Sequence, residues 1–202
     1  VVKGFDAEIR SIAEISENEL WLTTYRNGVI RVRLSEGGDH AETVRYYKKE
    51  SGFKSLKNIM VYPFKDRLVF VSDKGIYRYN EEKDGFVVDS LFDSELNPSE
   101  RGVYTFYQSP GGNIIFSGLN NRKNNIVYGI KKADDSYDWI TKPFLRIPEM
   151  MVLSIFYEPN GTIWIGGSGG LFRYNKKHLS DQIDNYRALI RKVVLNEDSV
   201  IF

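Results

Sequence analysis

A sequence motif recurs along the whole chain, and this repeat constrains the fold more than any other feature. The sharpest copy spans residues 160–174, where an apolar run containing a Trp is followed by a glycine-rich turn and a second apolar run. Related phrases occupy residues 19–32, 67–79 and 113–130. Their aligned positions lie 48, 46 and 49 residues apart and are Trp21, Val69, Ile115 and Trp164. Periods of this length are typical of solenoids, propellers and arrays, so the repeat sets the architecture.

An apolar segment precedes each copy of the motif and recurs with nearly the same spacing. Its aligned positions lie 47, 47 and 49 residues apart and are Ile12, Ile59, Phe106 and Ile155. In the first repeat, short runs rich in β-branched and aromatic residues predict four strands, at residues 9–15, 20–24, 29–34 and 43–47. The apolar residues of the first two strands do not alternate cleanly with polar ones, which indicates sheets that are buried on both faces.

Turn residues recur at one equivalent position of each repeat, between the first two strands. The four turns occupy residues 16–19, 62–66, 109–113 and 158–161, and are rich in Pro, Gly and Asn. Equivalent turns at equivalent offsets predict successive meanders. The sequence therefore predicts an all-β chain, a β-propeller segment of about four four-stranded antiparallel blades.

The repeat also predicts the domain organisation. Residues 1–180 are expected to form the blades, with repeats at about 5–52, 53–98, 99–147 and 148–180. Residues 181–202 do not match the repeat and are expected to supply a final outer strand and the start of a junction to a following domain. Within them, residues 191–202 show a strand, a turn and a second strand. Residues 181–190 could carry one or two helical turns, but residues 186–195 fit a strand better.

Composition narrows the class of protein. The formal net charge is +1, and the basic pairs, such as Lys48–Lys49, lie among acidic residues, so they are interpreted as solvated turns and no nucleic-acid partner is expected. The absence of cysteine removes disulfides and thiol chemistry. No apolar run is long enough to span a membrane, and no membrane contact by this segment is expected. Because the chain begins without Met or an apolar leader, we expect an excised piece of a longer protein.

The phrase at residues 161–174 resembles the short repeat of the two-component regulator propellers, which form the sensory part of large bacterial membrane sensors. Residues 21–32 are a second good match, residues 68–79 keep the second half with Val69 in place of Trp, and residues 114–130 match poorly. The resemblance covers about residues 5–180. It implies a periplasmic location, a seven-bladed propeller, a following immunoglobulin-like domain, a membrane span and a cytoplasmic output module.

Seven blades need more sequence than this chain holds, whereas four are present. An open arc of four blades is expected to expose two sheet faces that a closed ring would bury. Three alternatives follow: the ring closes as four blades, it pairs with another copy, or the chain is a fragment of a larger propeller. We favour the fragment, with other blades or domains of the parent protein and a homodimer as candidate partners.

No group of residues predicts catalysis. Trp21 and Trp164 occupy a fixed position of the repeat and are interpreted as core residues rather than sugar platforms. The glycine-rich run at residues 166–170 lacks the Lys and the helix of a phosphate-binding loop. His40 and His178 lie in different repeats without recurring partners. We therefore expect no cofactor, no metal and no enzyme activity in this segment.

Ligand contacts are expected on loops at one mouth of the ring, where a rigid scaffold presents variable residues. These loops join the second strand to the third or link consecutive repeats, and include residues 25–27, 73–74, 96–101 and 120–125. In this hypothesis the Arg residues contact carboxylates of an acidic sugar and Tyr25 stacks on its ring. The candidate ligand-binding residues are Tyr25, Arg26, Asp73, Lys74, Asn120, Arg122 and Lys123.

The sequence thus favours a non-catalytic, periplasmic sensor segment of a bacterial two-component signalling protein. Its ligand is expected to be a glycan or another small extracellular molecule. Two alternatives stay open: a propeller-fold lyase or glycosidase, and a structural spacer or dimerisation module.

Overall fold

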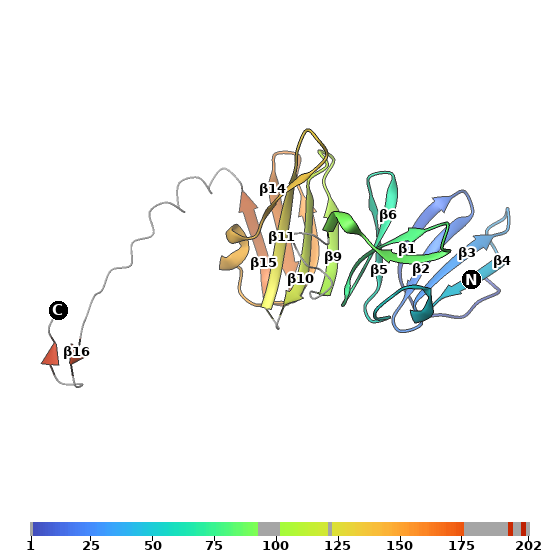
Figure 1. The fold of residues 1–202 in the computed structure, drawn as a ribbon, viewed down its shortest axis with the longest axis horizontal. Helices are drawn as coiled ribbons and strands as arrows, with labels where there is room; N and C mark the ends of the chain where they lie inside the picture. Colours follow the sequence, from blue (N-terminus) through green and yellow to red (C-terminus); the bar gives the residue numbers. More distant parts are fainter. Residues whose placement is uncertain (1, 93–101, 121–122, 176–193, 196–198, 201–202) are drawn as a thin grey trace.

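The computed structural model describes residues 2–92, 102–120, 123–175, 194–195 and 199–200, with the backbone alone at 119–120, 123–125, 194–195 and 199–200. Consecutive strands pair antiparallel into successive sheets, and Figure 1 shows the four large sheets arranged side by side. Two short 3₁₀ helices, η1 (Lys49–Ser51) and η3 (Lys142–Arg146), lie in the linkers after the first and third sheets. The expectation of an all-β chain is confirmed.

Three of these sheets have four described strands. Sheet 1 comprises β1 (Ile9–Ser16), β2 (Glu19–Thr24), β3 (Val29–Leu34) and β4 (Ala41–Tyr47). Sheet 2 comprises β5 (Met60–Phe64), β6 (Arg67–Ser72), β7 (Gly75–Asn80) and β8 (Gly85–Val88). Sheet 3 comprises β9 (Gly102–Gln108), β10 (Ile114–Asn120), β11 (Lys123–Lys131) and β12 (Tyr137–Ile140).

Sheet 4 has three described strands, which are β13 (Val152–Tyr157), β14 (Thr162–Gly167) and β15 (Gly170–Asn175). Of the outer strand predicted at residues 186–195, residues 186–193 lie outside the described residues, and so do residues 181–190, for which helical turns were the alternative. Further on, β16 (Val194–Leu195) pairs with β17 (Ser199–Val200), and residues 196–198 between them lie outside the described residues.

The first strands of neighbouring sheets contact one another in the order β1, β5, β9 and β13. Each sheet thus places its first strand on one side of the arc and its later strands on the other, as blades do around an axis. Sheets 1 and 4 lie at opposite ends of the row in Figure 1, so the described residues form an open arc rather than a closed ring.

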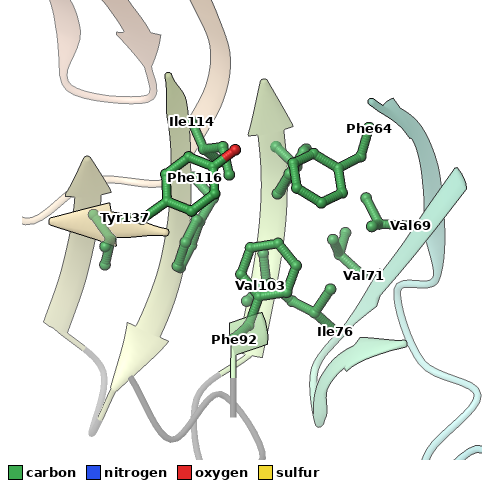
Figure 2. Close-up of a cluster of buried hydrophobic side chains, with 11 residues drawn as sticks. Phe64, Val69, Val71, Ile76, Phe92, Val103, Ile114, Phe116 and Tyr137 are labelled. Atoms are coloured by element: carbon green, nitrogen blue, oxygen red, sulfur yellow. The ribbon is translucent and has the colours of Figure 1, made fainter. Parts of the chain in front are cut away.

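Apolar clusters fill the spaces between the sheets. Between sheets 2 and 3, side chains from both sheets enclose Phe92, and Figure 2 shows Phe64, Val69 and Ile76 on one side facing Phe116 on the other. Similar clusters join sheet 1 to sheet 2 and sheet 3 to sheet 4. The middle strands are therefore buried on both faces, as their apolar runs predict; the last four residues of β2 and of β6 are all buried.

The expectation that an open arc exposes both of its end faces is wrong for sheet 1. The free face of sheet 1 was expected to be exposed, but its residues Leu22, Ile30 and Val32 are buried. The N-terminal segment covers this face, with Phe5 and Ala7 packed against it. Backbone hydrogen bonds tie this segment to the sheet: Lys3 accepts from the N–H of Ala41 and donates to the carbonyl of Asp39. The N-terminal segment thus buries the outer face of sheet 1, as a neighbouring sheet buries the corresponding faces of the other sheets.

Candidate functional site

The turn between β2 and β3 presents two of the predicted ligand-binding residues, Tyr25 and Arg26. Thr24 shapes this turn, because its hydroxyl donates to the carbonyl of Gly28 at 2.9 Å and accepts the N–H of Asn27 at 2.8 Å. Gly28 closes the turn with a φ of +83°, a conformation that side chains other than glycine rarely adopt. Tyr25 and Arg26 are both exposed, so this turn directs them away from the core.

The turn borders a hollow with a volume of about 740 Å³. Its other wall is the linker from sheet 1 to sheet 2, which includes η1. We call this site the basic hollow; its lining residues are Tyr25, Arg26, Lys49, Lys54, Ser55, Leu56, Lys57 and Asn58. The volume lies in the range of sites that bind small ligands.

Positive charge dominates the basic hollow. Four lining residues are cationic, namely Arg26, Lys49, Lys54 and Lys57, and none is a carboxylate. All four are exposed, and among the described residues none takes part in an ion pair. Because the whole chain carries a net charge of only +1, this excess is local.

Two guanidinium groups flank the ring of Tyr25. The guanidinium carbon of Arg10 lies 5.2 Å from the ring centroid and that of Arg26 lies 5.3 Å from it. Arg10 also donates to the side-chain oxygen of Asn58 at 2.9 Å. In this arrangement the aromatic ring holds two cations through cation–π contacts. The guanidinium of Arg26 thus lines the basic hollow, and that of Arg10 lies just outside the lining, beside Tyr25 and Asn58.

Aromatic packing anchors the linker that carries the lysines. The ring of Phe53 stacks on Phe86, with 4.2 Å between the centroids. The hydroxyl of Tyr77 accepts the N–H of Lys54 at 3.3 Å and donates to the carbonyl of Lys74 at 3.1 Å. These contacts fix the backbone, so the exposed lysine side chains extend from a rigid base.

The structure brings together only some of the predicted site residues. Tyr25 and Arg26 line the basic hollow, whereas Asp73 and Lys74, in the turn between β6 and β7, do not. Asn120 and Lys123 form the last backbone pair of β10 and β11, and Arg122 lies outside the described residues.

Part of the expected loop at residues 120–125 is wrong, because Lys123 to Asn125 continue the strand ladder. Backbone pairing satisfies N–H and C=O groups whatever the side chains are, so the Asn-rich composition does not end the strands.

Sequence reasoning missed Arg10, Lys49, Lys54 and Lys57. The available signal was the run of residues 48–57, which holds four lysines against one glutamate. The sequence interpretation assigned Lys48–Lys49 to a solvated turn. The position of Arg10 could not have been found in this way, because it lies on β1 and meets Tyr25 and Asn58, which line the basic hollow, only through tertiary packing.

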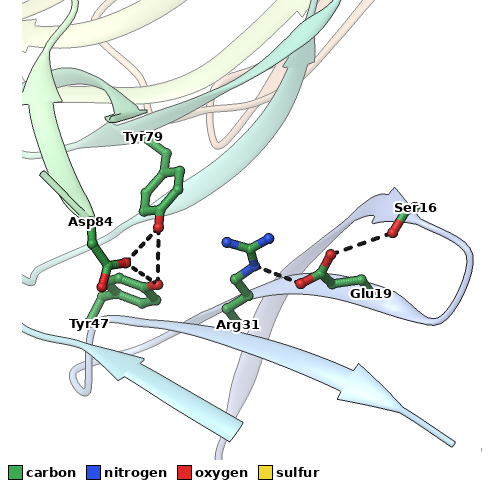
Figure 3. A network of polar contacts seen from close by, with 6 residues as sticks. All are labelled: Ser16, Glu19, Arg31, Tyr47, Tyr79 and Asp84. Atoms are coloured by element: carbon green, nitrogen blue, oxygen red, sulfur yellow. Dashed lines mark hydrogen bonds and ion pairs between the residues drawn. The ribbon is translucent and has the colours of Figure 1, made fainter. Parts of the chain in front are cut away.

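A second polar cluster lies between sheets 1 and 2 and is shown in Figure 3. The hydroxyls of Tyr47 and Tyr79 donate to one carboxylate oxygen of Asp84, at 2.9 and 2.6 Å. Burial, together with the hydrogen bond to Tyr79, raises the pKa of Tyr47 to about 12. Nearby, the guanidinium of Arg31 donates to Glu19 at 2.8 Å. A phenol with a raised pKa stays protonated at neutral pH and can donate to Asp84, so these hydrogen bonds join sheet 1 to sheet 2.

The described residues were compared with the requirements of a metal site and of a membrane-spanning helix, and meet neither. No group of three or more His, Asp or Glu side chains there is placed to hold a metal ion. The described part of the chain also contains no helix that is long and apolar enough to cross a membrane.

The open arc of consecutive antiparallel sheets defines a propeller-like segment. No family model and no curated protein matches the chain. Two solved structures similar to it contain the extracellular domain of BT4673 from B. thetaiotaomicron, described in one as a hybrid two-component system and in the other as a one-component system.

The two matches have TM-scores of 0.59 and 0.58 at 20% and 21% sequence identity, and cover 84% and 85% of this chain. They cover only 22% and 23% of the two larger chains, so this chain spans less than a quarter of their length. At this identity, the likeness shows a shared fold.

Proposed function

We propose that this chain is a non-catalytic segment of the extracellular or periplasmic sensor region of a two-component type signalling protein. The observation that carries the proposal is the open arc of sheets, whose fold matches extracellular domains of such a system over 84% of this chain. The basic hollow adds a recognition site on the loop side, where scaffolds of this kind place variable contacts. The candidate ligand is a small extracellular molecule, with a glycan as the first class to test.

Signalling from such a segment requires a difference in affinity. A ligand shifts an arrangement of ectodomains only as far as it binds one arrangement better than the other. The basic hollow lies beside the junction of sheets 1 and 2, formed by the turn of one and the linker to the next. A ligand there would contact both elements and could favour one relative placement of the two sheets.

The alternative of a lyase or glycosidase needs acidic, His or metal-binding residues that converge on one place. The lining of the basic hollow contains none of these. Its cations suit binding of a charged ligand, and no lining residue offers the pair of carboxylates that glycoside hydrolysis commonly uses. The sensor hypothesis therefore fits this site better than the enzyme hypothesis.

The test is a transcriptional one in the organism that carries the gene. We expect deletion of the gene to abolish induction of at least one operon by an extracellular polysaccharide digest. We expect the double variant Y25A/R26A to weaken that induction, while Lys142→Ala, in η3 between sheets 3 and 4, leaves it intact. Unchanged induction in the deletion strain, or turnover of a saccharide by the purified chain, would contradict the proposal.

A further inference from the structure

We infer that the basic hollow is an anion-binding site, whose ligand is a small molecule bearing two or more sulfate, carboxylate or phosphate groups. This inference deepens the proposed function and rests on it for the biological meaning of the ligand. The chemistry itself follows from the arrangement of charges.

Electrostatics supplies the first argument. Arg26, Lys49, Lys54 and Lys57 share one concave surface without a carboxylate in its lining. Like charges gathered in this way repel one another, and a concave wall of low dielectric strengthens the field inside. An anion relieves this repulsion, and a ligand with several negative groups relieves it more than a ligand with one.

The guanidinium pair supplies the second argument. Arg10 is held by both Tyr25 and Asn58, and Arg26 is held by Tyr25. Fixing these long side chains before binding reduces the entropy that is lost when an anion is bound. Guanidinium groups bind oxyanions in a bidentate manner, whereas lysines act as point charges, so the arginines give direction and the lysines add affinity.

The occupied ring of Tyr25 changes the earlier hypothesis about this residue. Because two guanidinium groups already lie near the ring, Tyr25 serves as a support for cations in this structure rather than as a free stacking platform for a sugar ring. Recognition in the basic hollow thus depends on the charge of the ligand more than on an apolar sugar face.

Size and charge distribution favour a small ligand over a nucleic acid. A volume of about 740 Å³ accommodates a molecule of disaccharide size. Nucleic acids instead need a long track of cations that follows the phosphate backbone. The chain as a whole is nearly neutral, which leaves the positive charge concentrated at one place.

The experiment is calorimetric titration of the purified chain with four probes of similar size. These are a disulfated disaccharide, a disaccharide of two uronates, a bisphosphorylated sugar and a neutral disaccharide. We expect at least one anionic probe to bind, with an affinity that falls about tenfold or more as salt rises from low to physiological concentration. The strongest of the three anionic probes identifies the kind of anion, and the neutral probe should not bind.

Charge-reversal variants locate the site. We expect R26E/K54E to weaken binding of the anionic probe at least tenfold. The control Lys142→Glu changes an exposed lysine of η3, between sheets 3 and 4, and should change binding less than twofold. Because all three residues are exposed, circular dichroism and thermal unfolding should show that each variant folds as the parent does.

Three outcomes would overturn the inference: no binding of any anionic probe, equally strong and salt-independent binding of the neutral probe, or equal losses in R26E/K54E and Lys142→Glu. These outcomes are independent of the proposed function. A sensor that responds to a neutral glycan would still pass the transcriptional test, whereas an anion-binding spacer would pass the calorimetric test and fail the transcriptional one.

Discussion

Asp84 concentrates the polar contacts between sheets 1 and 2 on one carboxylate. It accepts hydrogen bonds from Tyr47 and Tyr79 and pairs with Arg45. Its backbone has a φ of +45°, which Asn and Gly also tolerate. The residue at this position must therefore accept hydrogen bonds from two phenols and also adopt a positive φ. Substitutions that keep one property and remove the other can separate the two contributions to stability.

We expect Asp84→Gly to lower the free energy of unfolding by about 2–3 kcal/mol, because it leaves two partly buried hydroxyls without their carboxylate acceptor. Asp84→Asn keeps a carbonyl acceptor and tolerates the same φ, so it should cost only about 1 kcal/mol. Urea unfolding followed by tryptophan fluorescence measures both. Equal costs for the two variants would show that the hydrogen bonds to the phenols contribute little.

At the scale of the element, the glycine at the entry to the third strand has a positive φ, and in sheet 1 it also lies close to the fourth strand. Gly28 and Gly170 occupy the same position of the repeat, and both have positive φ. A Cβ atom on Gly28 would lie 2.1 Å from the carbonyl oxygen of Tyr47, on the fourth strand. A Cβ atom on Gly170 would have no described atom within 4 Å.

We therefore expect Gly28→Ala and Gly170→Ala to differ in cost although the local sequences are alike. Gly170→Ala should lose about 1 kcal/mol from the positive φ alone. Gly28→Ala should lose roughly 2–4 kcal/mol, because the contact with Tyr47 adds to the strain of its own positive φ, which is +83° against +125° at Gly170. Chemical unfolding of the two variants tests this. If both variants lost the same stability, close packing of the fourth strand would not be the cause.

The elements also show what the sequence could and could not predict. The third strand was predicted at residues 29–34, and β3 has those bounds, because its apolar run and turn residues are local signals. The longer ladder of β10 and β11 was missed, since its side chains are polar and only backbone pairing extends it. Of the residues that line the basic hollow, the sequence singled out Tyr25 and Arg26 as candidate ligand contacts. It did not single out the linker lysines, because tertiary packing brings them to the hollow.

At the scale of the molecule, one end of the arc has an apolar face that no described residue covers. Val29 and Ile76 occupy equivalent positions in sheets 1 and 2 and are fully buried at the contact with the next sheet. Leu171 occupies that position in sheet 4 and is 69% exposed. Trp164, paired with Phe156 and flanked by Arg173, lies on the same face. The repeat therefore places a surface built to contact a sheet at the end of the described arc.

We expect this face to drive self-association of the 202-residue chain, with a second copy covering it, because the corresponding face of sheet 1 is already covered by the N-terminal segment and offers no second apolar end. In a longer parent protein, a further sheet would take the place of the second copy. The variant F156E/L171E should lower the association constant about tenfold or more in sedimentation velocity experiments. Leu145→Glu is the matched control, since Leu145 is 74% exposed and lies in η3, outside this face. A chain that stays monomeric at high concentration, or equal effects of both variants, would exclude this face as the contact, because an apolar surface that drives association must respond to charge placed within it.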